Sequence, residues 1–196
     1  MKHRRAEVDR TTKETKIAVK LDLDSRSEGK ISTGIPFFDH MLSLLSAHGL
    51  FKLSISAKGD IDVDYHHTVE DVGIVFGDAL HKALGDRTGI NRYGHAVTPM
   101  DDALTAVTID LSNRPYLVYN APEKTVIKGN FDTQLTKEFF RAFATRGGMT
   151  VHINVLYGEN DHHVMESMFK ATGRALKSAI AFNKNVSGVR STKGFL

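Results

Sequence analysis

The chain contains one short stretch twice. The first copy reads Asp64-Tyr65-His66-His67-Thr68-Val69-Glu70, and the second reads Asn160-Asp161-His162-His163-Val164-Met165-Glu166. Both have the pattern His-His-x-x-Glu, both follow a polar turn that contains glycine, and both begin a long segment with helical apolar periodicity. The second copy starts 96 positions after the first, which is about half of the 196-residue chain. The repeat therefore predicts that the two halves of the chain share one fold.

Apolar periodicity predicts the same kinds of element in both halves. Alternating apolar and polar residues indicate strands, whereas apolar residues that recur every three or four positions indicate helices. In the first half the expected elements are a strand at 17–23, a helix at 36–49, strands at 51–55 and 61–65, and a helix at 66–84. In the second half they are a strand at 104–111, an extended segment at 116–119, a helix at 135–147, a strand at 151–155 and a helix from 162 to about 182.

This order of elements predicts a duplicated α+β fold. The stretch 107–114 also echoes 19–26, which lies 88 positions earlier. Strands and helices in this order favour helices packed on one face of a largely antiparallel sheet. We therefore expect one compact domain built from two half-domain repeats, at 1–92 and 93–196.

Composition narrows the class of protein. Hydrophobic residues make up 41% and charged residues 25%, which is ordinary for a globular fold. No apolar run approaches the length of a transmembrane helix, and no apolar region of a signal peptide follows the basic N-terminus. The absence of cysteine excludes disulfides and thiolate metal sites, and it fits a cytoplasmic protein. The net charge of +3 suits a small anionic substrate at least as well as a nucleic acid.

The repeated motif indicates metal binding. A histidine and a glutamate three or four positions apart share one face of a helix. Imidazole and carboxylate are ligands for zinc, manganese and iron. Adjacent histidines on a helix point about 100° apart, so one ion does not readily bind both. The economical arrangement has two ions, each of which takes one histidine from each motif.

The helix before each motif offers one more ligand. It is His40 in the first half and, at the aligned position, Glu138 in the second. One symmetric partition gives His40, His67, His162 and Glu166 to one ion, and Glu138, His66, Glu70 and His163 to the other. Exchanging the halves converts one set into the other. Nitrogen and carboxylate donors of this kind suit manganese, iron or zinc, and the sequence does not rank the three metals.

Further motifs occur along almost the whole chain, starting at Arg5-Ala6-Glu7-Val8. They are Gly34-Ile35-Pro36-Phe37-Phe38-Asp39-His40-Met41, Ser46-Ala47-His48-Gly49, Ser112-Asn113-Arg114-Pro115 and Ser191-Thr192-Lys193-Gly194. Together with both His-His-x-x-Glu copies, they make the chain resemble the imidazoleglycerol-phosphate dehydratase family of histidine biosynthesis. The resemblance implies two half-domains, each a mostly antiparallel four-stranded sheet with helices on one face, of the ribosomal protein S5 domain 2-like type. It also implies two manganese ions (Mn²⁺) per active site, a cytoplasmic location and a homo-oligomer of 24 subunits built from trimers.

The resemblance also implies roles for individual residues. The implied catalytic residues are Glu14, which serves as acid and base, His40, His48 and Glu166. The implied substrate-binding residues, several of them for phosphate, are Glu14, His40, His48, His66, His67, Arg92, Arg114, His162, Lys170, Ser191, Thr192 and Lys193. The implied metal ligands are the eight residues of the two sets. Many members of the family have histidine where this chain has Glu138, so this position departs from the family pattern.

The implied reaction removes water from imidazole glycerol phosphate and gives imidazole acetol phosphate, so it is a carbon–oxygen lyase reaction. The proton leaves a side-chain carbon near the imidazole, which is not an acidic position in water. The resemblance implies that the ring is held as imidazolate between the two ions and that a diazafulvene-like intermediate forms. A carboxylate such as Glu14 can move the proton, and Arg and Lys side chains can bind the phosphate.

Two other classes of function use some of the same features. A di-metal hydrolase of a small phosphorylated substrate could use the same ligands to activate water, and it would release a different product. A nucleic-acid-binding module would fit the positive net charge, but the sequence lacks aromatic residues interleaved with a basic run. We therefore expect no nucleic-acid partner and no membrane partner.

Overall fold

The computed structural model describes residues 3–121, 127–128 and 131–196. The first half contains strands β1 (Arg5–Thr11), β2 (Thr15–Asp22), β3 (Ile31–Ser32) and β4 (Lys52–Gly59), with helices α1 (Pro36–Gly49) and α2 (His66–Leu84). The second half contains strands β5 (Tyr93–Met100), β6 (Ala103–Asp110), β7 (Tyr116–Asn120), β8 (Ile127–Lys128), β9 (Phe131–Asp132) and β10 (Thr150–Tyr157), with helices α3 (Leu135–Gly147) and α4 (Asp161–Ile180). The repeat in the sequence thus becomes a repeat of elements in the described residues.

Each half forms a four-stranded sheet with the same topology. The strand order is β1-β2-β4-β3 in one sheet and β5-β6-β10-β7 in the other. In both sheets the first two pairings in this order are antiparallel. The third pairing, β4 with β3 or β10 with β7, is parallel. The registers also match, since Val19 pairs with Val8 and Ile55, and Val107 pairs with Ala96 and Ile153. The prediction of a duplicated α+β fold is confirmed.

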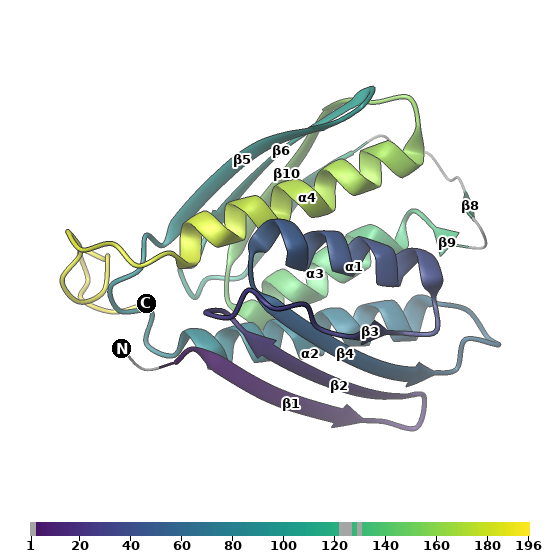
Figure 1. Ribbon diagram of the computed structural model, residues 1–196, viewed down its shortest axis with the longest axis horizontal. Helices are drawn as coiled ribbons and strands as arrows, with labels where there is room; N and C mark the ends of the chain where they lie inside the picture. Colours follow the sequence, from purple (N-terminus) through teal and green to yellow (C-terminus); the bar gives the residue numbers. More distant parts are fainter. Residues whose placement is uncertain (1–2, 122–126, 129–130) are drawn as a thin grey trace.

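The four helices lie between the two sheets (Figure 1). Helix α1 packs against α4, and α2 packs against α3, so each contact joins one half to the other. Phenylalanines fill the space between the helices: Phe139 of α3 lies 5.3 Å from Phe38 of α1 and 5.5 Å from Phe169 of α4, and Phe76 of α2 stacks 4.4 Å from Phe143. Full burial of an aromatic side chain contributes about 1.5–3 kcal/mol. This shared core therefore holds the halves together.

Two glycines allow the helices to cross closely. A Cβ on Gly173 of α4 would lie 2.9 Å from the backbone nitrogen of Gly49 and would also overlap the carbonyl of Leu45, both in α1. A Cβ on Gly77 of α2 would lie 2.8 Å from the nitrogen of Gly147 and 2.9 Å from the carbonyl oxygen of Phe143, both in α3. These two crossings are equivalent under the duplication, and they fix how the first turns of α2 and α4 face α3 and α1.

The predicted strand at 61–65 was wrong. Its residues form a turn, closed by a hydrogen bond from the Val63 nitrogen to the Asp60 carbonyl, and Val63 is 72% exposed. The strands that the sequence analysis missed are β1 and β5, which lie at the edges of their sheets, and the two-residue strands β3, β8 and β9. An edge strand buries few residues, and only Ala6 is buried in β1, so its apolar alternation is weak.

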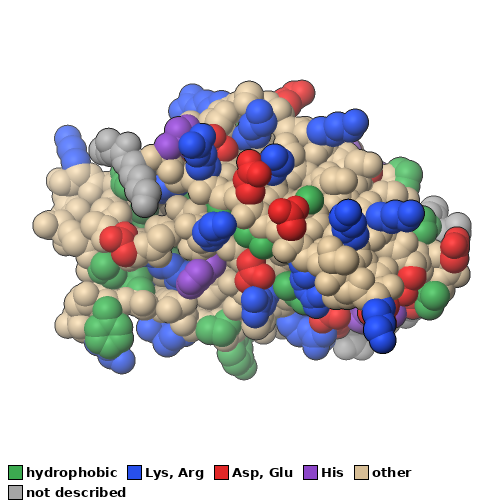
Figure 2. All heavy atoms as spheres, turned by 90° about the horizontal axis from the view of Figure 1, so that it is seen from below, with side chains coloured by type: hydrophobic (Ala, Val, Ile, Leu, Met, Phe, Trp, Pro, Cys, Tyr) green, Lys and Arg blue, Asp and Glu red, His purple; other side chains and the backbone are tan. Residues whose placement is uncertain are grey.

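The outer face of the first sheet carries charges of both signs. Figure 2 views the molecule from this side and shows Lys, Arg, Asp and Glu side chains interspersed across the face. Glu7 of β1 and Lys20 of β2, for example, form an exposed ion pair at 3.0 Å. A nucleic-acid interface would instead concentrate basic side chains in a patch or stripe. No helix within the described residues is long and apolar enough to cross a membrane.

Candidate metal centre and substrate site

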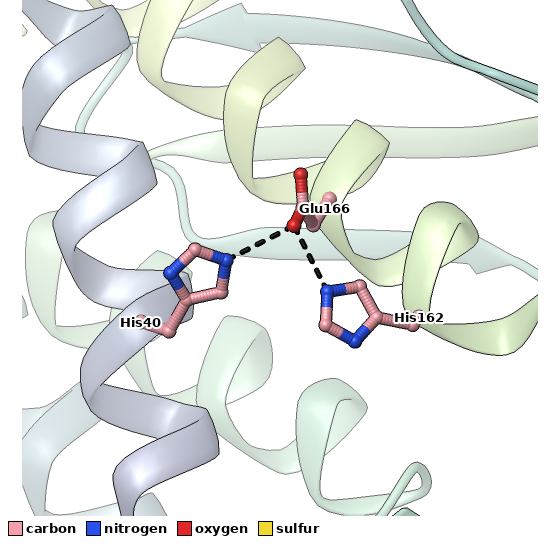
Figure 3. A group of neighbouring side chains, drawn as sticks. All are labelled: His40, His162 and Glu166. Carbon is pink, nitrogen blue, oxygen red and sulfur yellow. Dashed lines mark hydrogen bonds and ion pairs between the residues drawn. The ribbon is translucent and has the colours of Figure 1, made fainter.

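Three residues of the first predicted ligand set form a compact cluster between α1 and α4. Glu166 Oε1 lies 3.0 Å from His40 Nε2 and 2.9 Å from His162 Nε2, and one ligand atom from each of the three residues lies within 4.8 Å of the others (Figure 3). Glu166 follows His162 by one helical turn, while His40 comes from the facing helix. The Gly173 crossing holds α1 at the distance at which these side chains meet.

Glu166 is charged although it is only 7% exposed. Burial raises the pKa of its carboxyl group, but hydrogen bonds from Lys170, His40 and His162 outweigh burial and bring the pKa to about 2. Lys170 is the next residue along the same face of α4, and its Nζ lies 2.6 Å from Glu166 Oε2. The carboxylate is therefore ionised at neutral pH and has the charge that a metal ligand needs.

The second predicted set gathers around Arg141 of α3. Arg141 lies 3.4 Å from Glu70 and also forms an ion pair with Glu138, while His66 Nε2 lies 3.7 Å from Glu70. His66 and Glu70 belong to α2 and Glu138 to α3, so this group is the equivalent of the first cluster under the duplication. A guanidinium group bridges its two carboxylates, whereas Lys170 contacts the single carboxylate of the first cluster.

The second histidine of each motif points away from these clusters. The rings of His66 and His67 are inclined at 85°, and those of His162 and His163 at 83°. His67 Nδ1 lies 2.9 Å from Asp60 Oδ2 in the turn before α2. The structure thus brings three of the four predicted ligands of the first ion together, gathers Glu70, Glu138 and His66 around Arg141, and places His67 and His163 elsewhere.

His163 also pairs with an aspartate through Nδ1. Its partner is Asp102 in the turn between β5 and β6, which also accepts hydrogen bonds from the backbone nitrogens of Glu159 at 2.7 Å and Asn160 at 2.9 Å. Hydrogen bonds from the Asn160 nitrogen, His163 and the Glu159 nitrogen lower the pKa of Asp102. The sequence analysis missed both aspartates. A signal existed for Asp102, which lies 88 positions after Glu14 and is its equivalent under the duplication.

Glu14 lies at the other hairpin turn, between β1 and β2. Its carboxylate is about half exposed and lies 3.9 Å from His67 Nδ1. Thr12 holds the turn, because its Oγ1 accepts hydrogen bonds from the backbone nitrogens of Glu14 at 3.1 Å and Thr15 at 2.9 Å. The Thr15 hydroxyl in turn donates to Asp71 of α2. The predicted acid/base is therefore held next to the first motif by a well-anchored hairpin.

Most of the predicted phosphate-binding residues line one open depression of about 590 Å³. Its lining consists of Arg92, Tyr93, Arg114, Arg190, Ser191, Thr192 and Lys193. Arg92 is nearly buried and donates to both oxygens of Asp110, at 2.7 and 3.0 Å, and to the carbonyl of Arg190 at 2.6 Å. The hydrogen bonds to Asp110 raise the pKa of Arg92. Arg114 is exposed and lies 3.6 Å from Asp110, so it is the more available cation.

Besides Glu14 and the histidines of the two clusters and motifs, two more predicted substrate residues, Lys170 and His48, lie outside this depression. Lys170 is bound to Glu166, as described above. His48, at the end of α1, lines a separate groove of about 770 Å³ together with Arg174 and Lys177. Burial lowers the pKa of His48, and the charges of Lys170 and Arg174 lower it further. His48 is therefore neutral at physiological pH and can donate or accept a hydrogen bond.

Comparison with known proteins identifies the family. The sequence model of imidazoleglycerol-phosphate dehydratase matches residues 33–176. The imidazoleglycerol-phosphate dehydratase of Desulfosudis oleivorans is 60% identical over 191 residues, which cover 97% of this chain and 98% of that protein. The chain belongs to the imidazoleglycerol-phosphate dehydratase family.

Other members of the imidazoleglycerol-phosphate dehydratase family agree in sequence and in fold. The protein of Syntrophobacter fumaroxidans is 56% identical over 193 residues, which cover 98% of both chains. The crystal structure of the Staphylococcus aureus enzyme gives a TM-score of 0.81 at 39% identity and covers 91% of this chain and 99% of that one. The Pyrococcus furiosus enzyme in complex with (S)-C348 gives 0.84 at 39% identity, with coverage of 96% and 100%. The family resemblance seen in the sequence is confirmed, and the chain is an enzyme of the lyase class.

Proposed function

We propose that the chain dehydrates imidazoleglycerol phosphate in histidine biosynthesis and that it does so with two manganese ions per active site. Family membership supports the reaction. The observation that carries the metal part of the proposal is the His40–His162–Glu166 cluster, in which two imidazoles and an ionised carboxylate converge from two helices.

The donors of both sets fit manganese. All eight proposed ligands are imidazole nitrogens or carboxylate oxygens, and the chain has no cysteine. In the first cluster the ligand atoms are already close together, and Glu166 has the charge required. When bound, the ions would supply Lewis-acid polarisation and would orient the substrate. Glu138 is a competent oxygen donor at the position where many relatives have histidine.

We propose that a neighbouring copy of the chain completes each ligand set. His40, His162 and Glu166 supply one nitrogen–carboxylate group, and the fourth proposed ligand, His67, lies outside it and pairs with Asp60. His163 stands in the same relation to the second group. Each of these two histidines is partly exposed, and Nε2 of His163 lies 3.6 Å from Asp101 Oδ2, beyond hydrogen-bond distance. Nε2 of each ring is the proposed ligand atom. Sites shared between subunits would support the homo-oligomer of 24 chains built from trimers that the family resemblance implies.

The chain's own polar groups would bind the substrate and move the proton. The phosphate group fits the depression formed by Arg114, Ser191, Thr192 and Lys193, where hydroxyl and cationic donors gather. Arg92 is fixed to Asp110 and shapes this depression from behind. The neutral His48 and the charged Lys170 offer further hydrogen bonds to substrate from the α1–α4 side.

Glu14 would be the acid/base. Its carboxylate takes the proton from the second carbon of the side chain, and the carbon bonded to the imidazole loses its hydroxyl group. The same proton, returned to the departing hydroxide, gives water, and the enol that remains rearranges to the ketone imidazole acetol phosphate. One catalytic proton transfer of this kind contributes roughly 10²–10⁴-fold to the rate.

Product analysis after metal removal and restoration tests this function. Protein stripped with a chelator should be inactive, and Mn²⁺ should restore release of imidazole acetol phosphate with the phosphate ester intact. Release of inorganic phosphate would instead identify a di-metal hydrolase. Full dehydratase activity in the stripped protein, with metal content checked by elemental analysis, would contradict the metal part of the proposal.

We further propose a cytoplasmic location, consistent with an enzyme of amino-acid biosynthesis.

A further inference from the structure

Two aspartates make the same contact in the two halves of the domain. Asp60 Oδ2 lies 2.9 Å from His67 Nδ1, and Asp102 Oδ1 is bonded to His163 Nδ1. In both cases the contacted atom is Nδ1, and the histidine is the second of its motif. The first histidines, His66 and His162, contact carboxylates of their own helices through Nε2. The second histidines are therefore held differently from the first.

The two aspartates do not correspond to each other under the duplication. Asp60 lies in the turn that follows β4, whereas Asp102 lies in the hairpin turn between β5 and β6. By the sheet registers, which shift by one residue at the bulge between Val155 and Tyr157, the equivalent of Asp60 is Glu159, and the equivalent of Asp102 is Glu14. The two halves thus make the same histidine–carboxylate contact with residues from different loops. A contact inherited passively from one ancestral half would use equivalent residues in both.

Both aspartates are fixed from behind. The carbonyl of Asp60 accepts a hydrogen bond from the Val63 nitrogen at 2.8 Å, which closes the turn. The second carboxylate oxygen of Asp102 accepts from two backbone nitrogens in the loop before α4, at 2.7 and 2.9 Å. The turn therefore fixes the backbone of Asp60, whose other carboxylate oxygen is buried without a hydrogen-bond partner among the described residues, whereas the carboxylate of Asp102 is itself held by two backbone nitrogens. The contact orients the ring relative to the backbone.

We infer that Asp60 and Asp102 are positioning residues that hold His67 and His163 with the proton on Nδ1, so that Nε2 presents its lone pair to a metal ion. The inference rests on the proposed function, because it assigns a role towards the proposed ions. A neutral imidazole carries one proton, and a carboxylate that accepts it at one nitrogen leaves the other nitrogen as the ligand. The carboxylate also makes that nitrogen more basic.

Asp60 has a second consequence, which concerns Glu14. In the second half the hairpin carboxylate, Asp102, is hydrogen-bonded to His163. In the first half the equivalent carboxylate, Glu14, stays 3.9 Å from His67 Nδ1, beyond hydrogen-bond distance, because Asp60 occupies that nitrogen. The exchange of partner frees a carboxylate at the first hairpin. Glu14 is therefore available for proton transfer, whereas its equivalent is structural.

The test measures Mn²⁺ binding and histidine tautomers in the full chain. Asp60→Ala and Asp102→Ala should each bind Mn²⁺ roughly 10–100-fold more weakly at one class of site, the range found when such outer partners of ligands are removed. Nitrogen NMR of the metal-free protein at pH 8.5 should show His67 protonated on Nδ1 in the wild type and a mixture of tautomers in Asp60→Ala. Asp60→Glu, which keeps the carboxylate, should recover part of the affinity.

Two controls separate orientation from general damage. Asp62→Ala removes an exposed aspartate from the same turn and should change neither Mn²⁺ affinity nor the tautomer. Glu14→Gln leaves the Asp60 contact intact, so His67 should keep its tautomer and the protein its Mn²⁺ affinity. Circular dichroism and the mass in solution show whether each variant folds and assembles as the wild type does.

The outcomes distinguish this inference from the proposed function. If the wild type binds no Mn²⁺, both fail. If the wild type binds two ions per chain and the two aspartate variants bind them equally well with an unchanged tautomer, only the positioning role fails. Weaker binding without any change of tautomer would also overturn it, because the aspartates would then act through the local fold and not through the imidazole.

Discussion

Replacing Gly173 by alanine tests whether the α1–α4 crossing positions the metal ligands. The added Cβ would lie 2.9 Å from the Gly49 nitrogen, against about 3.4 Å for ordinary contacts, and still closer to the Leu45 carbonyl oxygen. Both obstacles are backbone atoms of a helix, so no side-chain rotation relieves the overlap. Overpacking of this kind costs about 1–3 kcal/mol. We expect α1 to move away from α4 by roughly 0.5 Å or more, since cores resist such insertions.

Helix propensity opposes part of this cost. Alanine stabilises a helix interior by about 1 kcal/mol relative to glycine. Because the overlap is with backbone, we expect a cost near the upper part of its range and a net destabilisation of about 1–2 kcal/mol. For a chain of this size each kcal/mol lowers Tm by about 2–4 °C, so Tm should fall by roughly 2–8 °C. His40 should also separate from Glu166, and Mn²⁺ affinity should fall.

Thermal unfolding in the presence of chelator measures the loss of stability, and calorimetric titration with Mn²⁺ measures the affinity. Ser178→Ala, on the exposed side of α4, is the matched control, and a surface change of this kind stays within about 0.5 kcal/mol of the wild type. The reasoning is refuted if Gly173→Ala is as stable as the wild type and binds Mn²⁺ equally well, because the crossing would then have room for a methyl group.

Four further predictions follow from the site. Removing either outward histidine, by His67→Ala or His163→Ala, should lower Mn²⁺ content by about one ion per chain; elemental analysis showing full loading contradicts the two ligand sets. Glu14→Gln should reduce kcat by roughly 10²–10⁴-fold at unchanged Mn²⁺ content, and near-normal turnover would move the acid/base role to another group. Arg141→Ala frees two carboxylates for a cation and should tighten Mn²⁺ binding at the second set; weaker binding would show that the guanidinium supports the site. Because the folded-state pKa of Glu166 is lowered to about 2 from 4.5, its contribution to stability is present above pH 4.5 and is lost as pH falls towards 2, so Glu166→Gln should flatten acid unfolding over that range; an unchanged acid profile would contradict the role of its ion pairs.

The repeat in the sequence predicted the fold better than single-strand periodicity did. The two His-His-x-x-Glu copies and the similarity of 107–114 to 19–26 predicted the duplicated α+β architecture. The two sheets of equal topology confirm it. Periodicity failed at 61–65, where apolar residues alternate on an exposed turn, and at β1 and β5, where sheet edges bury few side chains. The division of the halves at residue 92 stays a prediction, although β5 begins at Tyr93.

The site was predictable where its residues share a helix and less so where loops contribute. His162 and Glu166 lie one turn apart, and their meeting follows from helical geometry. His40 lies 126 positions before Glu166, and their contact depends on the crossing of α1 and α4. In the sequence, only the assumed symmetry suggested this contact. The Asp60–His67 contact depends on a turn that the sequence analysis had taken for a strand. No local sequence pattern predicts the hydrogen bond between Arg92 and Asp110, which ties up a side chain that was expected to bind phosphate.

The helix contacts that join the two halves have the pattern expected for an interface between two identical copies. Each half supplies the partner of the other, since α1 packs on α4 and α3 packs on α2, and the glycine crossings are equivalent. This is the geometry of a two-fold dimer whose copies have been joined end to end. A single half, free in solution, would meet the same surface on a second copy and form both crossings at once. Gene fusion then adds one gain that a symmetric dimer lacks: the two carboxylates at the hairpins can diverge, one to hold a histidine and one to carry a proton.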